Sequence, residues 1–162
     1  MTVLIEPIHS KYDDDICAII KSVGAEFGAV GEGFGPSDPE VEEMSLHYTS
    51  DRSSLYLVAT IDGKIVGGCG LAPFNGSAKT CELKKLFLLP ESRGLGLGKT
   101  LSLQCLEFAK QRGFESCYLD TLSSMKAAIK LYETLGFGHL DKPLAGTEHG
   151  GCDVWMLKNL ED

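Results

Sequence analysis

The chain alternates between two hydrophobic periodicities, one typical of helices and one typical of strands. Apolar residues recur at helical spacing over residues 13–27, 98–112 and 124–135, and a shorter acidic helix is expected at about 38–47. Runs with strand character occupy residues 2–8, 54–74 (two runs around an Asp-Gly turn), 79–90, 116–121, 137–140 and 153–160. Glycines at Gly113 and Gly136 are expected to end the last two helices.

The resulting order is β-α-α-β-β-β-α-β-α-β-β, with neither an internal repeat nor a linker. A run of antiparallel strands followed by alternating strands and helices predicts a mixed sheet with helices on its faces. The sequence therefore predicts an α/β fold of mixed α+β type in one domain, residues 1–162, with six or seven strands and about four helices.

Composition narrows the classes of function. The formal net charge of −8 disfavours a nucleic-acid partner, and an acidic surface is compatible with a cationic substrate or simply with solubility. No apolar run approaches the roughly 20 residues that span a bilayer, and the N-terminal stretch lacks the features of a signal peptide, so we expect a cytoplasmic protein without a membrane partner. The six cysteines form no C-x-x-C pair, so no metal site is expected.

The segment "PESRGLGLGKT", Pro90–Thr100, is typical of a loop that holds phosphate. A nucleotide-hydrolase P-loop would need its first glycine where the chain has Arg93, and the dinucleotide fingerprint would need one more residue between glycines. The pattern [RQ]-G-x-G-x-[GA] of coenzyme A binders fits every fixed position of "RGLGLG". A plain strand-to-helix turn would need only one glycine.

Alternating glycines let the backbone approach an anion closely, and the following helix presents its positive end there. Arg93 and Lys99 add charge, and arginine can contact phosphate oxygens in a bidentate manner. The loop is therefore expected to bind a pyrophosphate.

The chain resembles the GNAT superfamily of N-acetyltransferases, most sharply over "ELKKLFLLPESRGLGLGKTL" and "AAIKLYETLGF". The resemblance implies acetyl-CoA as co-substrate and a sheet whose strands splay apart beside the loop, so that the backbone before the loop pairs with pantetheine. The implied cofactor-binding residues are Leu86, Phe87, Leu88, Arg93, Gly94, Leu95, Gly96, Leu97, Gly98 and Lys99.

The resemblance also implies catalytic residues. Tyr132, before the Gly-Phe dipeptide, takes the position of the acid that protonates the leaving thiolate, although it also lies on the apolar face of its helix. Glu82 takes the position of a catalytic base; a structural ion pair with a lysine such as Lys84, the imidazole of His149, or water remain alternatives. Many members carry an asparagine where this chain has Met125, which leaves one expected pantetheine contact open.

The substrate pocket is expected between two loops, at about residues 26–44 and 140–155. Four acidic side chains there suit either an amine substrate or a solvated helix: Glu40, Glu42, Glu43 and Glu148. The leading function is acetyl transfer to a primary amine of a small molecule or a protein, by a monomer or a homodimer. The alternatives are a non-catalytic acetyl-CoA-binding module that regulates a partner, and transfer of a larger acyl group on the same scaffold.

Overall fold

A computed structural model describes residues 1–147 and 149–161. The helices and strands follow the predicted order, and most predicted bounds lie within a few residues of those observed. The elements are β1 (Val3–Pro7), α1 (Asp13–Glu26), α2 (Met44–His47), β2 (Leu55–Ile61), β3 (Lys64–Pro73), β4 (Thr80–Leu88), α3 (Leu97–Gln111), β5 (Ser116–Thr121), α4 (Lys126–Thr134), β6 (Gly138–His139) and β7 (Val154–Asn159). The predicted acidic helix is a 3₁₀ turn, Pro39–Glu43, that continues into α2.

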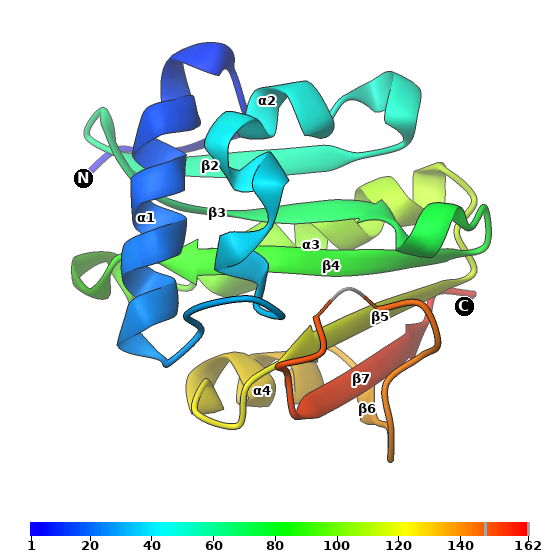
Figure 1. The fold of residues 1–162 in the computed structure, drawn as a ribbon. Helices are drawn as coiled ribbons and strands as arrows, with labels where there is room; N and C mark the ends of the chain where they lie inside the picture. Colours follow the sequence, from blue (N-terminus) through cyan, green and yellow to red (C-terminus); the bar gives the residue numbers. More distant parts are fainter. Residues whose placement is uncertain (148, 162) are drawn as a thin grey trace.

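The strands form one mixed sheet of seven, in the order β1-β2-β3-β4-β5-β7-β6 (Figure 1). The first four strands pair antiparallel, β4 pairs parallel with β5, and β7 pairs antiparallel with both β5 and β6. The predicted mixed sheet of six or seven strands is confirmed, with seven strands. The predicted Asp-Gly turn joins β2 to β3, with both Asp62 and Gly63 at positive φ, as a tight hairpin turn requires.

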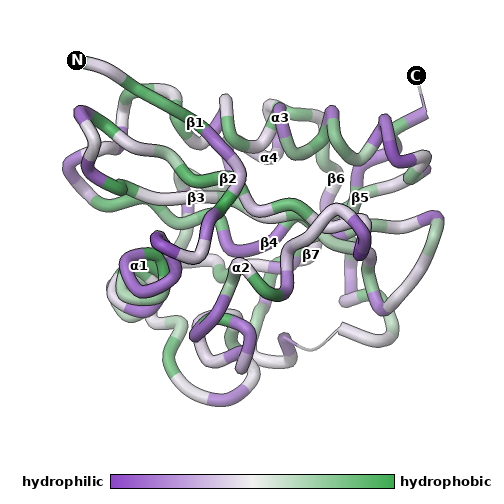
Figure 2. The backbone as a smooth tube through the Cα atoms, turned by 90° about the horizontal axis from the view of Figure 1, so that it is seen from above, coloured by the Kyte–Doolittle hydropathy of each residue, from purple (hydrophilic) through white to green (hydrophobic). Residues whose placement is uncertain are grey.

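Helices cover both faces of the sheet, with α1 and α2 on one side and α3 and α4 on the other (Figure 2). Because side chains alternate along each strand, β2 contributes to both cores: Tyr56 and Val58 pack toward α1, and Leu57 and Ala59 pack toward α3. The core under α1 also contains Ile16, Ile20, Val41 and Met44, and the core under α3 contains Leu101, Cys105, Leu119 and Met156.

The pairing between β4 and β5 is short. It covers Thr80 with Ser116, Cys81 with Cys117 and Glu82 with Tyr118, after which the two strands separate. β4 runs on to Leu88 beside β3 alone, whereas β5 continues beside β7. The sheet is therefore splayed from Glu82 onward, as the resemblance implies.

A β-bulge lies in β4 just after this separation. The register with β3 shifts between Gly68 and Gly70, and opposite this shift Lys85 adopts the left-handed conformation at φ +57°. A non-glycine residue in this region is uncommon and carries strain. The buried hydroxyl of Tyr56 donates a hydrogen bond of 2.9 Å to the Lys85 carbonyl, which helps to hold the bulge.

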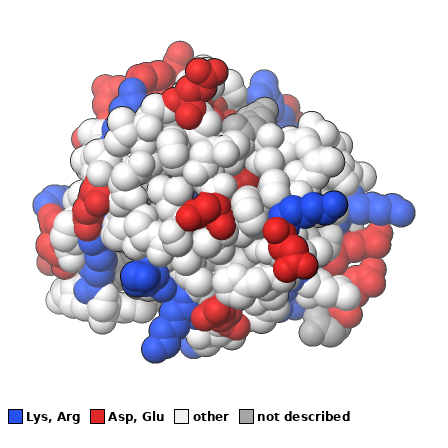
Figure 3. Space-filling view, turned by 60° about the horizontal axis from the view of Figure 1, so that its bottom comes forward, with Lys and Arg blue, Asp and Glu red and all other residues white. Residues whose placement is uncertain are grey.

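On the face that Figure 3 presents, acidic and basic side chains are interspersed with uncharged surface, and an acidic side chain lies near the middle. All six cysteines are free thiols, and four of them are buried. None of the helices in the described part of the chain is long and apolar enough to cross a membrane.

Candidate active site

The glycine-rich loop forms an open cradle at the start of α3. Gly94 and Gly96 have φ values of 81° and 78°, and a Cβ placed on either would meet no atom within 4 Å. Both residues therefore use conformations that favour glycine, and their free side faces open space. Gly98 has a different role, because a Cβ there would lie 3.3 Å from Leu131 of α4. This glycine lets α3 and α4 approach closely.

A cavity of about 290 Å³ opens in front of this cradle. Nine of the ten residues predicted to bind the cofactor line the cavity, and the exception is Leu95, whose side chain is 47% exposed. The opposite wall comes from the end of α1 and from α4, through apolar residues that include Phe27, Met125 and Leu131. The end of β4, the loop and α4 thus enclose one largely apolar space with the N-terminus of α3 at its rim.

The two basic side chains of the loop differ in their surroundings. The Arg93 guanidinium donates two hydrogen bonds to the Glu26 carboxylate, at 2.6 and 2.8 Å, and two more to the Leu88 carbonyl. It also lies over the Phe27 ring. Arg93 therefore holds the loop against α1. Its position in the sequence indicated only a contact with phosphate. Among the described residues no carboxylate lies within 4 Å of the Lys99 ammonium, which is exposed at the cavity wall.

A second, smaller cavity of about 60 Å³ lies where β4 and β5 separate. It shares Phe87 and Met125 with the first cavity, so the two adjoin at these side chains. Its other walls come from β4, β5 and the two loops predicted to form the substrate pocket, here residues 29–36 and 149–152. The backbone joins these loops, because Gly151 N–H donates to the Gly33 carbonyl at 2.9 Å.

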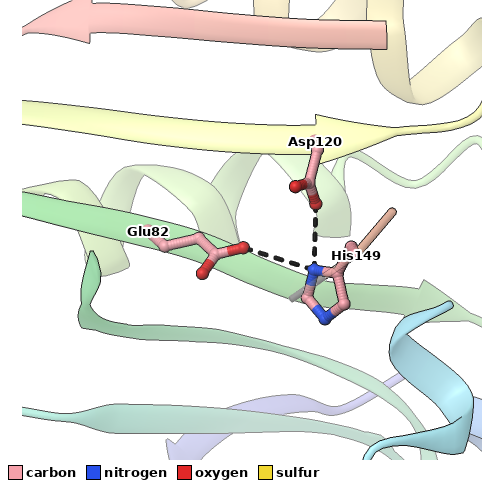
Figure 4. Close-up of side chains that lie close together, drawn as sticks. All are labelled: Glu82, Asp120 and His149. Atoms are coloured by element: carbon pink, nitrogen blue, oxygen red, sulfur yellow. Dashed lines mark hydrogen bonds and ion pairs between the residues drawn. The ribbon is translucent and has the colours of Figure 1, made fainter. Parts of the chain in front are cut away.

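A cluster of charged side chains lies on the polar wall of this smaller cavity (Figure 4). The His149 ring accounts for three of its contacts: Nδ1 lies 3.0 Å from Asp120 Oδ1 and 3.5 Å from Glu82 Oε2, and Nε2 lies 2.8 Å from Asp38 Oδ2. His149 is only 5% exposed. The structure therefore brings together two predicted base candidates, Glu82 and His149, that are 67 positions apart (149 − 82).

The surroundings of His149 fix its charge. Both ring nitrogens face carboxylate oxygens, which only accept hydrogen bonds, so a neutral ring could satisfy one of them and the imidazolium satisfies both. Burial alone would lower the pKa of His149, but the hydrogen bonds to Asp120 and Asp38 outweigh it and raise the pKa from 6.5 to about 11. At neutral pH the ring is therefore a cation, and it cannot accept a proton from a substrate.

Lysines complete the cluster. Lys85, in the bulge, directs its ammonium into the protein, where Nζ lies 2.8 Å from Asp38 and 3.0 Å from Glu40. Burial alone would raise the pKa of Asp38, but the hydrogen bond from His149 and the charge on Lys85 lower it from 3.8 to about 2. Lys84 Nζ lies 4.0 Å from both Glu40 and Glu82.

Among the described residues, the cluster carries more negative than positive charge. Its carboxylates are Asp38, Glu40, Glu82 and Asp120, and its cations are Lys84, Lys85 and protonated His149. Four negative and three positive charges leave a net charge of −1. Glu82 is 8% exposed, and its ion-pair partners among the described residues are distant, at 3.5 and 4.0 Å, so within this part of the chain its carboxylate has the weakest polar contacts of the four.

The same wall offers the ligands of a small cation. One donor atom each from Glu82, Asp120 and His149 lies within 4.8 Å of the others, a spacing that a metal ion could bridge. A metal ion bound to the His149 ring would have to displace a ring proton. An ammonium group could instead bind to the carboxylates of Glu82 and Asp120 alone.

Tyr132 lies apart from both cavities. Its ring is 6% exposed, belongs to the core under α3 and packs edge-on against Phe137 at 5.9 Å between ring centres. It contributes to the wall of neither cavity, although its helix neighbours Ala128 and Leu131 line the larger one. Burial raises its pKa, so the phenol keeps its proton at neutral pH.

Sequence reasoning missed Asp38, Asp120 and Lys85, since an isolated aspartate or lysine in a loop or strand gives no signal. Of the acidic residues expected at the substrate approach, Glu40 joins the cluster, Glu42 pairs with Lys21 on the surface, and Glu43 is exposed. Glu148 lies outside the described residues.

Comparison with known proteins gives a consistent result. The family model described as "Acetyltransferase (GNAT) family" matches residues 25–137. The chain is 43% identical over 147 residues to the uncharacterized N-acetyltransferase YjgM of Escherichia coli, covering 90% of this chain and 87% of that protein. It is 33% identical over 121 residues to the human N-acetylaspartate synthetase, covering 75% of this chain but 37% of that longer protein.

Solved structures share the fold. An acetyltransferase of the GNAT family from Staphylococcus aureus superposes with a TM-score of 0.85 at 22% identity, covering 99% of this chain and 100% of that one. The putative acetyltransferase yncA of Salmonella typhimurium, solved with its cofactor acetyl-CoA, superposes with a TM-score of 0.79 at 20% identity, covering 100% and 96% of the two chains.

The raised pKa of His149 predicts a specific dependence of stability on pH. Below about pH 6.5 both the folded and unfolded chains carry the proton; between 6.5 and about 11 only the folded chain does, so stability falls as pH rises. We expect the excess unfolding free energy of the wild type over His149→Gln to shrink steadily from pH 6.5 to 10 in urea titrations. His139→Gln provides the control for the loss of an imidazole, because His139 lies on the surface, where an ion pair contributes little to stability. A constant difference across this range for His149→Gln would contradict the assigned charge.

Proposed function

Since the chain belongs to the GNAT family of acetyltransferases and is therefore an acyltransferase, we propose that it moves the acetyl group of acetyl-CoA to a primary amine by direct attack of the amine on the thioester. One observation carries this proposal: the glycine cradle at the N-terminus of α3 opens into a cavity that adjoins the charged gap between β4 and β5. An anion-binding end and an amine-binding end thus lie on either side of one junction.

In the proposed complex, the pyrophosphate of acetyl-CoA lies against the loop amides of Arg93–Lys99 at the positive end of α3. The exposed ammonium of Lys99 adds charge, while Arg93 mainly holds the loop to α1 through Glu26. The pantetheine arm passes Leu86, Phe87 and Leu88, where β4 has left β5 and its edge can pair with amides. The acetyl group would then reach the smaller cavity, whose volume of about 60 Å³ supports a short acyl group.

Glu82 is the proposed base. An amine must lose a proton before it attacks, and protonated His149 cannot take one. Glu82 belongs to the adjoining cavity wall and, among the described residues, has the weakest polar contacts of the carboxylates in the cluster. It can attract an ammonium and accept its proton directly or through a water. Attack of the nitrogen lone pair on the carbonyl carbon forms the new C–N bond as the C–S bond breaks.

Tyr132 is the proposed source of the proton for the departing thiolate. Burial keeps the phenol protonated at neutral pH, and its helix also lines the cofactor cavity. Because its ring does not line that cavity here, the role requires the hydroxyl to reach the sulfur in the complex, and a purely structural role in the core is the alternative.

The first prediction tests the function as a whole. We expect free thiol to be released from acetyl-CoA only when a primary amine is supplied.

Gly96→Asn should weaken CoA binding at least tenfold in calorimetry, because a side chain would enter the cradle. Gly113→Asn is the matched control, since Gly113 has a similar φ of 84° and open surroundings at the far end of α3. Equal CoA affinity in the two folded variants would contradict the assigned cradle.

The second prediction concerns Glu82. We expect Glu82→Gln to lower kcat/KM by roughly 10²-fold at neutral pH, because the amide cannot accept the proton. The loss should diminish at high pH, where more of the amine is already neutral. The control is Glu42→Gln, which removes an exposed carboxylate paired with Lys21. An identical pH–rate profile for the wild type and Glu82→Gln would transfer the role to water.

The third prediction separates the two roles of Tyr132. Tyr132→Phe keeps the ring in its core and removes only the hydroxyl, so we expect kcat to fall roughly ten- to a thousandfold. CoA affinity and the Tm should change little. Tyr12→Phe removes a phenol that donates to Glu6 and lines neither the cofactor cavity nor the small cavity in the described part of the chain, so this variant should keep full turnover. Full turnover by Tyr132→Phe when chemistry limits the rate would leave Tyr132 as a core aromatic alone.

A further inference from the structure

A third cavity, of about 400 Å³, adjoins the charged cluster on the side away from the cofactor loop. It shares Glu82 and Lys84 with the small cavity in the gap between the strands. The small cavity, at about 60 Å³, has room for little more than the reacting groups, since one water occupies about 30 Å³ in the liquid. The larger, polar cavity beside it offers room for the body of an acceptor whose amine reaches Glu82.

The polar cavity has charges of opposite sign at different points on its wall. Glu40 and Glu82 supply carboxylates, and Lys84 lies 4.0 Å from each of them. Arg52 supplies a guanidinium, and no carboxylate among the described residues lies within 4 Å of it. Ser54 and Asn75 are uncharged polar residues of the same wall. The carboxylate of Glu82 suits an ammonium, whereas the guanidinium of Arg52 suits an anion.

The turn that carries Arg52 is held in place. The Arg52 carbonyl accepts a hydrogen bond of 3.0 Å from the Ser54 hydroxyl, and Ser53 adopts the left-handed conformation at φ +51°. Arg112, at the end of α3, donates to the Ser50 carbonyl at 2.9 Å. These contacts fix the backbone under Arg52 before any acceptor binds, which lowers the entropic cost of holding an anion there.

We propose that the acceptor is a primary amine that also carries an anionic group, with its ammonium at Glu82 and its anion at Arg52. The inference deepens the proposed acetyl transfer and rests on it. The ammonium would bring the net charge of −1 in the described cluster to zero, and the anion would neutralise Arg52. Amino acids and aminoalkyl phosphates share this chemistry. The acetylated amino acid in the name of the human relative, N-acetylaspartate synthetase, agrees with the first of these.

The test compares acceptors of equal length with and without the anion. ω-Amino acids of two to five carbons are assayed for thiol release beside the alkylamines of the same length, and aminoethyl phosphate is compared with β-alanine to separate carboxylate from phosphate. We expect the anionic acceptors to have the higher kcat/KM, with one length preferred because an acceptor has to reach from Glu82 to Arg52.

Variants of Arg52 link this preference to the guanidinium. Arg52→Gln should lower the ratio of kcat/KM for the anionic acceptor over its alkylamine by roughly 10- to 100-fold, the usual effect of a charge-assisted hydrogen bond. Arg52→Lys should recover part of the ratio. Lys64→Gln removes one positive charge from an exposed pair with Glu91 and should keep the wild-type ratio, which controls for net charge.

The outcomes separate this inference from the proposed function. Turnover with equal efficiency for both members of each pair, or an unchanged ratio in Arg52→Gln, overturns the inference alone. No thiol release with any amine contradicts the proposed function. In that case, calorimetric titration of the same compounds tests the inference by binding alone. Weaker binding of the amino acids to Arg52→Gln than to the wild type supports the inference. Binding of the alkylamines that is as tight as that of the amino acids overturns it.

Discussion

The early separation of β4 from β5 is the constraint on which the whole site depends. A parallel pair that continued past Glu82 would fill the space between the strands with backbone hydrogen bonds and leave no room for substrates. The two strands instead keep other partners: β4 stays with β3 and β5 stays with β7. Each strand is thus supported on its outer side, which lets the inner side remain open without loss of the sheet.

An open gap in a sheet leaves polar groups in the middle of a protein, where the lack of a hydrogen-bond or ion-pair partner costs free energy. The charged cluster supplies such partners. Buried charges are tolerated when each has a partner of opposite sign, and here Asp38, Lys85 and His149 form a continuous series of such pairs. The bulge turns the buried ammonium of Lys85 toward this series, on the side of the sheet that α1 and α2 cover. Local strain at one residue of β4 therefore serves to neutralise carboxylates that come from a loop.

Sequence reasoning predicted the fold and the position of the glycine-rich loop because both depend on local patterns. The helical periods, the Asp-Gly turn and the alternating glycines are each contained in a short window, and all appear where they were expected. The cluster depends on contacts that no local pattern encodes: His149 bonds to Asp38 across 111 positions, and Arg93 bonds to Glu26 across 67. The loop that carries His149 is rich in glycine, and both its backbone and its histidine are bonded to the opposite loop. The position of Tyr132 on the apolar face was equally visible in the sequence, and the structure places the ring firmly in the core.

The two proposed ends of the site are built from different parts of the chain, and this difference predicts that they differ in specificity. The proposed cofactor end would use the backbone of the loop and the edge of β4, so its side chains could vary as long as the glycines stay and the cavity remains apolar. The proposed acceptor end uses charged side chains from five separate segments: the loop before α2, the turn before β2, β4, β5, and the loop before β7. A single substitution there changes the charge that an acceptor meets, without affecting the cradle at α3. Such an arrangement keeps the donor constant while the loops determine which amine is recognised.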